Sequence, residues 1–240
     1  MKIPEIILTD KEKAQRAKLD RAARPRIAAT IVLYSGDRKN PKILMGQRAR
    51  RHDFMPSVYV FPGGRVDRAD NYAQYCDDLP RRTEKILEAA YAPRKARACV
   101  LAAIRETWEE TGIMLGQKGD WHKNLNHKSW DAFRQANIIP DLSNIEVFGR
   151  AITPPHRHKR FDTWFFAQPF NGNLAAASDS HELLNVDWFT FDQIKELKIH
   201  RATTMMLRVL KDFLEKPALP SDVFYSRMEY QQYKVSRFPE

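Results

Sequence analysis

One eight-residue segment constrains this chain more than any other: positions 105–112 read Arg-Glu-Thr-Trp-Glu-Glu-Thr-Gly. At about 100° per residue on a helix, the carboxylates of Glu106, Glu109 and Glu110 share an arc of about 100°. The apolar side chains of the same stretch project from the opposite side: Val100, Leu101, Ile104 and Trp108. The pattern predicts a helix with a core-facing back and an acidic front.

The ends of this helix are also marked in the sequence. Pro93 suits a first helical position, and Gly112 suits the residue that ends a helix, so we predict a helix over 93–111. Small residues share the acidic side one or more turns toward the start of the helix: Cys99, Ala102 and Ala103. They would let another chain segment or a ligand approach closely.

The acidic front has two interpretations. A solvated acidic face is the usual one, but like charges three or four residues apart each cost roughly 0.2–0.5 kcal/mol. Arg105, four residues before Glu109, is the one cation placed to offset them. Converging carboxylates with so little compensation favour a hard divalent cation, Mg²⁺ or Mn²⁺, which prefers oxygen ligands.

The rest of the chain alternates short strands and helices. We predict an exposed helix over 10–24, strands over 27–34, 42–47, 58–61, 145–152, 161–168 and 186–191, and further helices over 82–90, 130–136, 192–197 and 203–215. There is no regular strand–helix–strand rhythm, so the expected fold class is α/β, a mixed sheet covered by helices on both faces.

Two separated segments together resemble a known motif. Phe61-Pro62-Gly63-Gly64 and the later 105–113 segment are similar to the two halves of the Nudix box, G-x5-E-x7-R-E-U-x-E-E-x-G-U, where U is apolar. Asp70 occupies the position of the first Glu of the motif, a residue whose role is mostly to anchor the loop. Thr107 occupies a position where the motif has an apolar residue. Thirty-four residues separate Asp70 from Arg105 instead of seven, an insertion of 27 residues at 71–97.

An interrupted box of this kind resembles the Nudix branch that includes the peroxisomal coenzyme A diphosphatase, and the resemblance covers about residues 26–215. It implies a Nudix-type α/β/α sandwich in which the insertion leaves the site intact. The expected domains are an N-terminal extension (1–25), a Nudix hydrolase domain (26–215) and a C-terminal tail (216–240).

The resemblance also implies metal-dependent hydrolysis of a diphosphate bond in a small nucleoside diphosphate derivative. The implied metal ligands are Glu106, Glu109, Glu110 and the Gly64 carbonyl, and Glu106 or Glu110 would orient or deprotonate the water. Arg105 would fix the rotamer of a box carboxylate. Residues 43–48 approximate a segment typical of coenzyme A diphosphatases, with Arg48 one position late, so coenzyme A or acyl-CoA is the leading substrate.

Other residues are weaker candidates, each with an ordinary alternative. Arg48 and Arg160 lie in basic loops that could hold phosphates or be merely solvated, and Glu182 could add a ligand or base from a later loop. The His156-x-His158 pair has no third ligand at metal spacing. Trp121, Trp130 and Trp164 could stack a base, although an alternating strand favours core packing for Trp164.

The composition of the chain limits the classes of binding partner that it can have. Net charge is +10, and nine of these excess charges lie within residues 1–66, which favours an anionic partner; we expect a small diphosphate rather than nucleic acid.

There is no apolar run long enough for a membrane span, and Cys76 and Cys99 form no disulfide framework, so we expect a cytoplasmic protein without a membrane partner. The sequence leaves open whether the chain forms a homodimer. The competing functions are a catalytically silent Nudix-fold protein that binds a nucleotide or RNA, and an enzyme that processes RNA 5′ ends.

Overall fold

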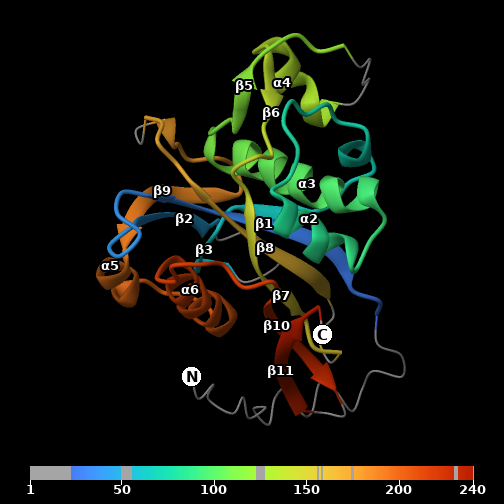
Figure 1. The fold of residues 1–240 in the computed structure, drawn as a ribbon. Helices are drawn as coiled ribbons and strands as arrows, with labels where there is room; N and C mark the ends of the chain where they lie inside the picture. Colours follow the sequence, from blue (N-terminus) through green and yellow to red (C-terminus); the bar gives the residue numbers. More distant parts are fainter. Residues whose placement is uncertain are drawn as a thin grey trace.

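The computed structural model describes residues 23–49, 56–122, 128–155, 157, 159–173, 176–229 and 232–239. Within these ranges a nine-stranded mixed sheet lies between two helical layers (Figure 1). Helices α2 (Arg81–Glu88) and α3 (Pro93–Thr111) cover one face, and α5 (Phe191–Glu196) and α6 (Arg201–Leu214) cover the other. The predicted α/β/α sandwich is confirmed, whereas the helix predicted over 10–24 lies almost entirely outside the described residues.

The strands of the main sheet are β1 (Arg26–Ser35), β2 (Lys42–Arg48), β3 (Tyr59–Val60), β4 (Gly63–Arg65), β7 (Glu146–Ile152), β8 (Phe161–Pro169), β9 (Leu183–Thr190), β10 (Val223–Glu229) and β11 (Gln232–Phe238). Their order is β11-β10-β7-β8-β1-β2-β3, with β4 beside β1 and β9 beside β2. The pairs β1–β8 and β7–β10 are parallel, and the remaining pairs are antiparallel.

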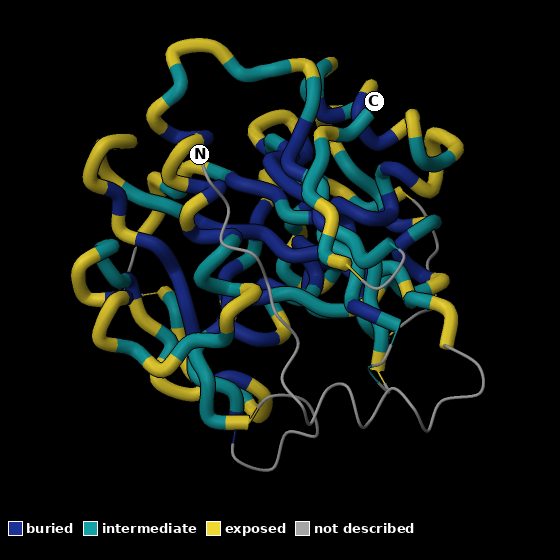
Figure 2. Tube along the Cα trace, turned by 90° about the horizontal axis from the view of Figure 1, so that it is seen from below, coloured by how far each residue is buried: buried dark blue, intermediate teal, exposed yellow. Residues whose placement is uncertain are grey.

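Alternating side chains of the central strands supply two cores. In β1, Ala29, Ile31 and Leu33 belong to the cluster shared with α3, while Val32 belongs to the cluster shared with α6. Such alternation follows from the period of two in a strand. Figure 2 shows these central strands as buried, with exposed residues gathered in the outer turns and helix ends.

The pairing of β1 positions the site. Its end pairs with β2 through Tyr34–Ile43, but its first half pairs with β4, so that Ala29 faces Gly64 and Thr30 faces Gly63. Since α3 packs on both β1 and β4, the Gly-Gly segment is held against the acidic side of the helix.

A small second sheet lies over α3 on the side away from the main sheet. It consists of β5 (Gly116–Lys118) and β6 (Ile138–Pro140), accompanied by η2 (Lys128–Trp130) and α4 (Asp131–Gln135). Trp130 and Phe133 from this unit are fully buried in the core cluster around α3, and the Phe133 ring contacts Trp108 edge-on. Helix α3 is therefore enclosed for most of its length.

The 71–97 insertion is a packed element rather than a free loop. It includes α2, which lies against α3 and β7, and the first turn of α3 itself. The Arg82 guanidinium donates to the Val147 carbonyl at 2.7 Å and to the Glu146 carboxylate at 3.0 Å. Residues 216–240, expected to be a tail, include β10 and β11, which extend the main sheet.

No helix in the described ranges is both long enough and apolar enough to cross a membrane. Both cysteines are free, Cys76 at the surface and Cys99 in the core.

Candidate active site

Helix α3 has the predicted bounds because both of its ends are locally encoded. Pro93 is its first residue, and Gly112 ends it in the left-handed conformation (φ 76°) with its N–H bonded to the Trp108 carbonyl at 2.8 Å. The small residues of the acidic side, Cys99, Ala102 and Ala103, are fully buried in the core that α3 shares with β1. The close approach they permit is therefore to the sheet, and the acidic front is confined to the last turns.

Arg105 organises the carboxylates around it. Its Nε and Nη2 donate to the two oxygens of the buried Asp70 at 2.9 and 3.1 Å, and Nη1 donates to Glu106 at 2.8 Å and Glu109 at 2.9 Å. Nη2 also donates to the Arg65 carbonyl at 2.9 Å. One guanidinium therefore joins the loop after β4 to two carboxylates of the helix, as expected for a fork-shaped cation.

Asp70 has a further partner that comes from the small second sheet. Trp130 Nε1 donates to Asp70 Oδ1 at 3.3 Å, and the Asp67 amide donates to Oδ2 at 2.7 Å. The side chain of Asp70 is completely buried. Asp70 thus anchors the loop, as predicted, and also links it to the unit that covers α3.

The three glutamates of the acidic front, Glu106, Glu109 and Glu110, all have raised pKa values. Burial raises the pKa of Glu110 to about 8 and that of Glu106 to about 7, and it also raises the pKa of Glu109. Arg105 opposes the rise at Glu106 and Glu109, while the Gly63 N–H, which donates to Glu110 at 2.8 Å, opposes it at Glu110. These contacts do not compensate the buried negative charge.

Gly64 lies directly against this group. A Cβ at position 64 would overlap the Glu106 carboxylate, so glycine is required for the close approach of β4 to the helix. The Gly64 backbone is therefore held beside the carboxylates that were predicted to share a metal with it.

A loop before β9 closes the site from the opposite side. The Ser178 amide donates to the Thr111 carbonyl at 2.9 Å, which ties the loop to the end of α3. Ser180 Oγ accepts the amides of Glu182 and Leu183 at 3.2 and 3.0 Å, so the backbone that presents Glu182 is fixed. The charge of Glu182 contributes to the raised pKa of Glu106 and Glu110.

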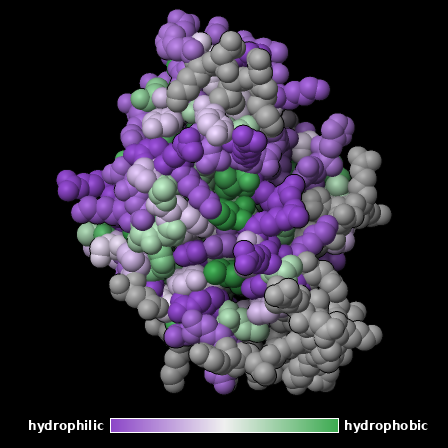
Figure 3. All heavy atoms as spheres, turned by 90° about the vertical axis from the view of Figure 1, so that its right-hand side faces the viewer, coloured by the Kyte–Doolittle hydropathy of each residue, from purple (hydrophilic) through white to green (hydrophobic). Residues whose placement is uncertain are grey.

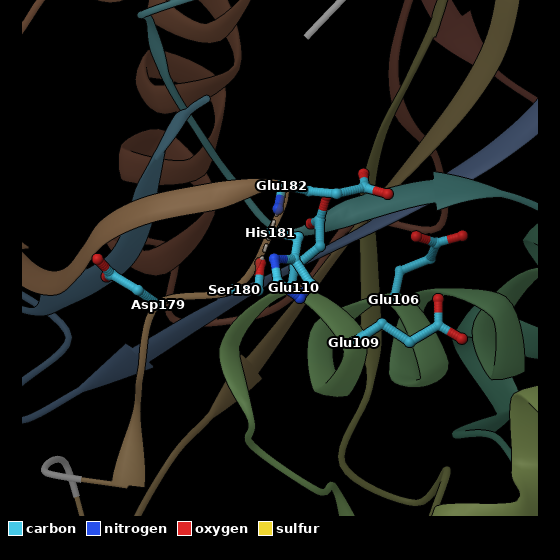
Figure 4. A pocket seen from close by; sticks show the side chains of 7 residues that line it. All are labelled: Glu106, Glu109, Glu110, Asp179, Ser180, His181 and Glu182. Atoms are coloured by element: carbon cyan, nitrogen blue, oxygen red, sulfur yellow. Dashed lines mark hydrogen bonds between the residues drawn. The ribbon is translucent and has the colours of Figure 1, made fainter. Parts of the chain in front are cut away.

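Together these elements enclose the acidic cavity, a space of about 430 Å³. It is lined by Glu106, Glu109, Glu110, Asp179, Ser180, His181 and Glu182. In Figure 4, Glu106 and Glu109 rise from one side of α3 and Glu182 lies across from the helix, whereas Asp179 lies apart. Arg48 faces the same carboxylates: burial lowers its pKa, while the charges of Glu110, Glu182 and Glu106 act to raise it.

Comparisons with known proteins agree with this geometry. The family model of the NUDIX domain matches residues 98–210. A Caenorhabditis elegans protein named as a nudix hydrolase is 27% identical over 68% of this chain and 50% of its own length. A Gallus gallus protein named as an acyl-coenzyme A diphosphatase is 26% identical over 59% of this chain and 54% of its own length. The chain spans about half the length of these curated relatives.

Among solved structures, a NUDIX hydrolase from Alicyclobacillus acidocaldarius is 25% identical to this chain, with a TM-score of 0.59. The likeness covers 80% of this chain and 93% of that one. Residues 98–210 of this chain are therefore similar to a Nudix domain. The matched residues begin inside α3, after the insertion, so the Gly-Gly segment and Asp70 lie outside the match. The pairing of β4 with β1 nevertheless brings Gly64 against Glu106 of the matched helix.

Two of the three departures from the Nudix box, Thr107 and Asp70, have local explanations. Thr107, at an apolar position, is fully buried, and its hydroxyl donates to the Ala103 carbonyl at 2.8 Å within the same helix. Asp70, one methylene shorter than Glu, still reaches both nitrogens of Arg105.

Some predicted residues do not lie at the acidic cavity. Arg160 donates to the carbonyls of Thr153 and Ala23 at 3.0 and 2.6 Å and does not line the acidic cavity. Trp164 is fully buried and donates to the Tyr91 hydroxyl at 3.1 Å, so its predicted core packing agrees with the structure. His156 and His158 lie outside the described residues.

The other tryptophans are also engaged internally. Trp130 is buried and bonded to Asp70, and Trp121 donates to the Ile138 carbonyl at 2.8 Å. No local sequence pattern indicates that Trp130 meets Asp70, because sixty residues separate them. Likewise Asp179, Ser180 and His181 reach the cavity through a loop whose path depends on the sheet.

A second group of ligand-type side chains lies by the small second sheet. Cys76, Asp77 and Asp141 offer ligand atoms within 4.8 Å of one another. The Gln117 amide donates to Asp77 at 3.1 Å and to Asp141 at 2.7 Å, so it bridges the two carboxylates without a cation.

Proposed function

We propose that this chain is a metal-dependent hydrolase that cleaves a diphosphate bond in a nucleoside diphosphate joined to another group. The observation that supports it is the acidic cavity, in which three glutamates of one helix meet Glu182 while Arg105 is already shared with Asp70. A cavity of this charge repels a diphosphate unless cations are bound, and it attracts those cations.

The residues present fit Mg²⁺ or Mn²⁺. The donors are carboxylates and a backbone carbonyl, oxygen ligands that hard cations prefer, and the absent Cβ of Gly64 leaves room for the Glu106 carboxylate. Glu106, Glu109, Glu110 and the Gly64 carbonyl would hold the ion. When bound, it neutralises the phosphates and makes a bound water more acidic.

The protein side chains have separable tasks in this proposal. A water oxygen forms a bond to one phosphorus, the bond from that phosphorus to the bridging oxygen breaks, and the other half leaves as a phosphate monoester. Glu106, Glu110 or Glu182 accepts the water proton, since each lines the same cavity. Arg105 keeps Glu106 and Glu109 in position. Arg48, whose charge acts on Glu110 and Glu106, would meet a substrate phosphate.

The proposed substrate is coenzyme A or an acyl-CoA. The support is the name of the Gallus gallus relative, together with the resemblance of residues 43–48 to a coenzyme A segment. The proposed domain comprises residues 26–215 with the 71–97 insertion, and the further strands β10 and β11 belong to the same sheet.

The test is hydrolysis with Mg²⁺ or Mn²⁺ of a panel: coenzyme A, acyl-CoA, NADH, ADP-ribose, nucleotide sugars, dinucleoside polyphosphates and capped RNA. We expect coenzyme A to give adenosine 3′,5′-bisphosphate and 4′-phosphopantetheine, detected by mass spectrometry, and to remain intact in EDTA. Glu84→Gln is the matched control for Glu110→Gln because Glu84 pairs with Arg97 outside the cavity. Absence of turnover with every compound, combined with metal-independent binding of one, would show a silent binding protein instead.

A further inference from the structure

A second cavity of about 390 Å³ lies at the other end of α3. It is bounded by the start of β1, the connection from β4 to η1 (Ala69–Asn71) and the first turn of α3. Four cationic side chains line it, and we call it the basic cavity: Arg26, Arg65, Arg68 and Lys95. Asp67 is the one carboxylate among its lining residues.

The positive charge of the basic cavity is not neutralised by the described parts of the chain. Within those parts, the side chains of Arg26, Arg65 and Arg68 form neither a hydrogen bond nor an ion pair. The Lys95 ammonium lies over the uncharged Tyr91 ring, 5.1 Å from its centroid. All four cationic residues are exposed at the cavity, and their combined positive charge attracts a multiply charged anion more strongly than a singly charged one.

The floor of the basic cavity is apolar. Ile27 and Val66 line it and are partly buried against the main core cluster. Figure 3 looks onto the side of the molecule where β1 and α3 begin in Figure 1, and it shows an apolar hollow among hydrophilic side chains. A ligand with a flat or apolar part next to a phosphate matches this combination.

The loop that presents Arg68 is held in place. The Asn71 amide donates to the Asp67 and Arg68 carbonyls at 3.4 and 3.3 Å, and the Asp67 amide donates to the buried Asp70. A fixed loop loses little conformational freedom when a ligand binds.

The segment that lines the basic cavity is bonded to the residues that hold the acidic cavity. Arg65 follows Gly64 directly, and its carbonyl accepts from Arg105, which holds Glu106 and Glu109. The Asp67 carboxylate lies close enough to contribute to the raised pKa of Glu109. From Gly64 to Arg68 the chain spans at most about 14 Å, so the two segments lie within the length of a substrate that carries a phosphate at each.

We propose that the basic cavity binds a phosphate monoester of the same substrate whose diphosphate lies at the acidic cavity. In coenzyme A this group is the 3′-phosphate of the ribose. The inference rests on the proposed function, and it adds a recognition site for the nucleoside half at residues outside the Nudix box.

The test compares coenzyme A with 3′-dephospho-coenzyme A, which has the same diphosphate bond but no monoester. For the natural chain we expect kcat/KM to be about tenfold higher with coenzyme A. In the double variant Arg68→Gln, Lys95→Gln we expect KM for coenzyme A to rise about tenfold, with KM for the dephospho compound changed less than about twofold. The control is Arg201→Gln, Arg208→Gln, which removes two exposed cations from α6 on the other face of the sheet.

The outcomes separate this inference from the proposed function. Equal kcat/KM for both compounds, or equal losses in the double variant, would overturn the inference and leave the hydrolase proposal intact. Failure to hydrolyse either compound would overturn the substrate assignment. In that case, nucleotide binding measured by calorimetry tests whether the basic cavity binds a phosphate monoester. Adenosine 3′,5′-bisphosphate should bind more tightly than adenosine 5′-monophosphate, and this difference should vanish in the double variant. Equal binding of the two nucleotides to the natural chain would overturn the inference.

Discussion

Helix α3 contains two arginines that each bind three carboxylates, yet the two clusters differ in chemistry. Arg97 pairs with Asp78, Glu84 and Glu88 at 2.7, 2.7 and 3.3 Å. These carboxylate side chains are between 33% and 48% exposed, and they come from α2 and the turn before it. The Arg97 cluster fastens the 71–97 insertion to the helix.

Arg105 binds its three carboxylates just as closely, but in a buried setting. Its own side chain is 3% exposed, and Asp70 is completely buried. Burial acts to raise the pKa of Asp78, yet its bonds to Arg97 and to the Leu79 amide lower it overall. At Glu106 and Glu109 the pKa stays raised despite Arg105. Three carboxylates around an arginine therefore do not by themselves set the carboxylate pKa: it falls at Asp78, where bonds to Arg97 outweigh burial, and rises at Glu106 and Glu109, where burial outweighs Arg105.

The largest expected difference between the clusters is in catalysis. Glu110→Gln and Glu109→Gln should each lower kcat by about a hundredfold or more, because each removes a proposed metal ligand from the acidic cavity. Glu84→Gln, at the Arg97 cluster, should leave kcat unchanged. Steady-state kinetics with circular dichroism to verify folding provide the measurement. Natural rates in both α3 variants would refute metal ligation by these residues.

The second difference is in stability. Arg105→Gln leaves Asp70 buried without its charged partner, and breaking a buried pair of this kind costs about 3–5 kcal/mol. Arg97→Gln should cost about 1 kcal/mol or less, since its partners remain hydrated. Urea unfolding of both variants gives the free energies. Equal losses would mean that burial does not distinguish the two clusters.

The third difference is in the response to pH without metal. The folded-state pKa values of Glu106 and Glu110, about 7 and about 8, lie above the unfolded value near 4.5. The folded state therefore binds more protons between these values, so the free energy of unfolding should fall as pH rises from about 5 to 8. Arg48, Arg105 and Glu182 face these groups and contribute to the balance.

Added Mg²⁺ should weaken or reverse this trend, because it binds the ionised carboxylates. Melting temperatures in EDTA and in Mg²⁺ across this pH range test it. Glu110→Gln should flatten the metal-free profile, and Glu84→Gln should not. A metal-free chain that becomes more stable from pH 5 to pH 8 would contradict the assigned burial of these carboxylates.

The contrast also explains which parts could be predicted from the sequence. The bounds of α3 and its acidic front are local, set by Pro93, Gly112 and the spacing of three glutamates, and both were predicted. β4 has only three residues and cannot show a strand period, so it was missed, although it brings Gly64 to Glu106.

The contacts around Asp70 could not be predicted because they are long-range. Arg105 and Trp130 lie 35 and 60 residues from Asp70 along the chain, and no local pattern joins them. The strands β10 and β11 contain several aromatic residues, but which edge they join depends on the whole sheet. The sequence thus specifies the carboxylates on one helix, whereas the fold specifies what holds and surrounds them.

The smallest expected effect concerns Trp130, which ties the Arg105 cluster to the small second sheet. Trp130→Phe keeps an aromatic ring but removes the N–H donated to Asp70, a bond worth about 1 kcal/mol. If that bond positions Asp70 and Arg105, kcat should fall about fivefold with KM unchanged, and the Mg²⁺ concentration for half-maximal rate should rise. Trp121→Phe is the matched control. The Trp121 ring lies beside the Trp130 ring, and this substitution also removes an indole N–H, the one that donates to the Ile138 carbonyl. Equal effects of both substitutions on kcat would show that Trp130 acts only through packing.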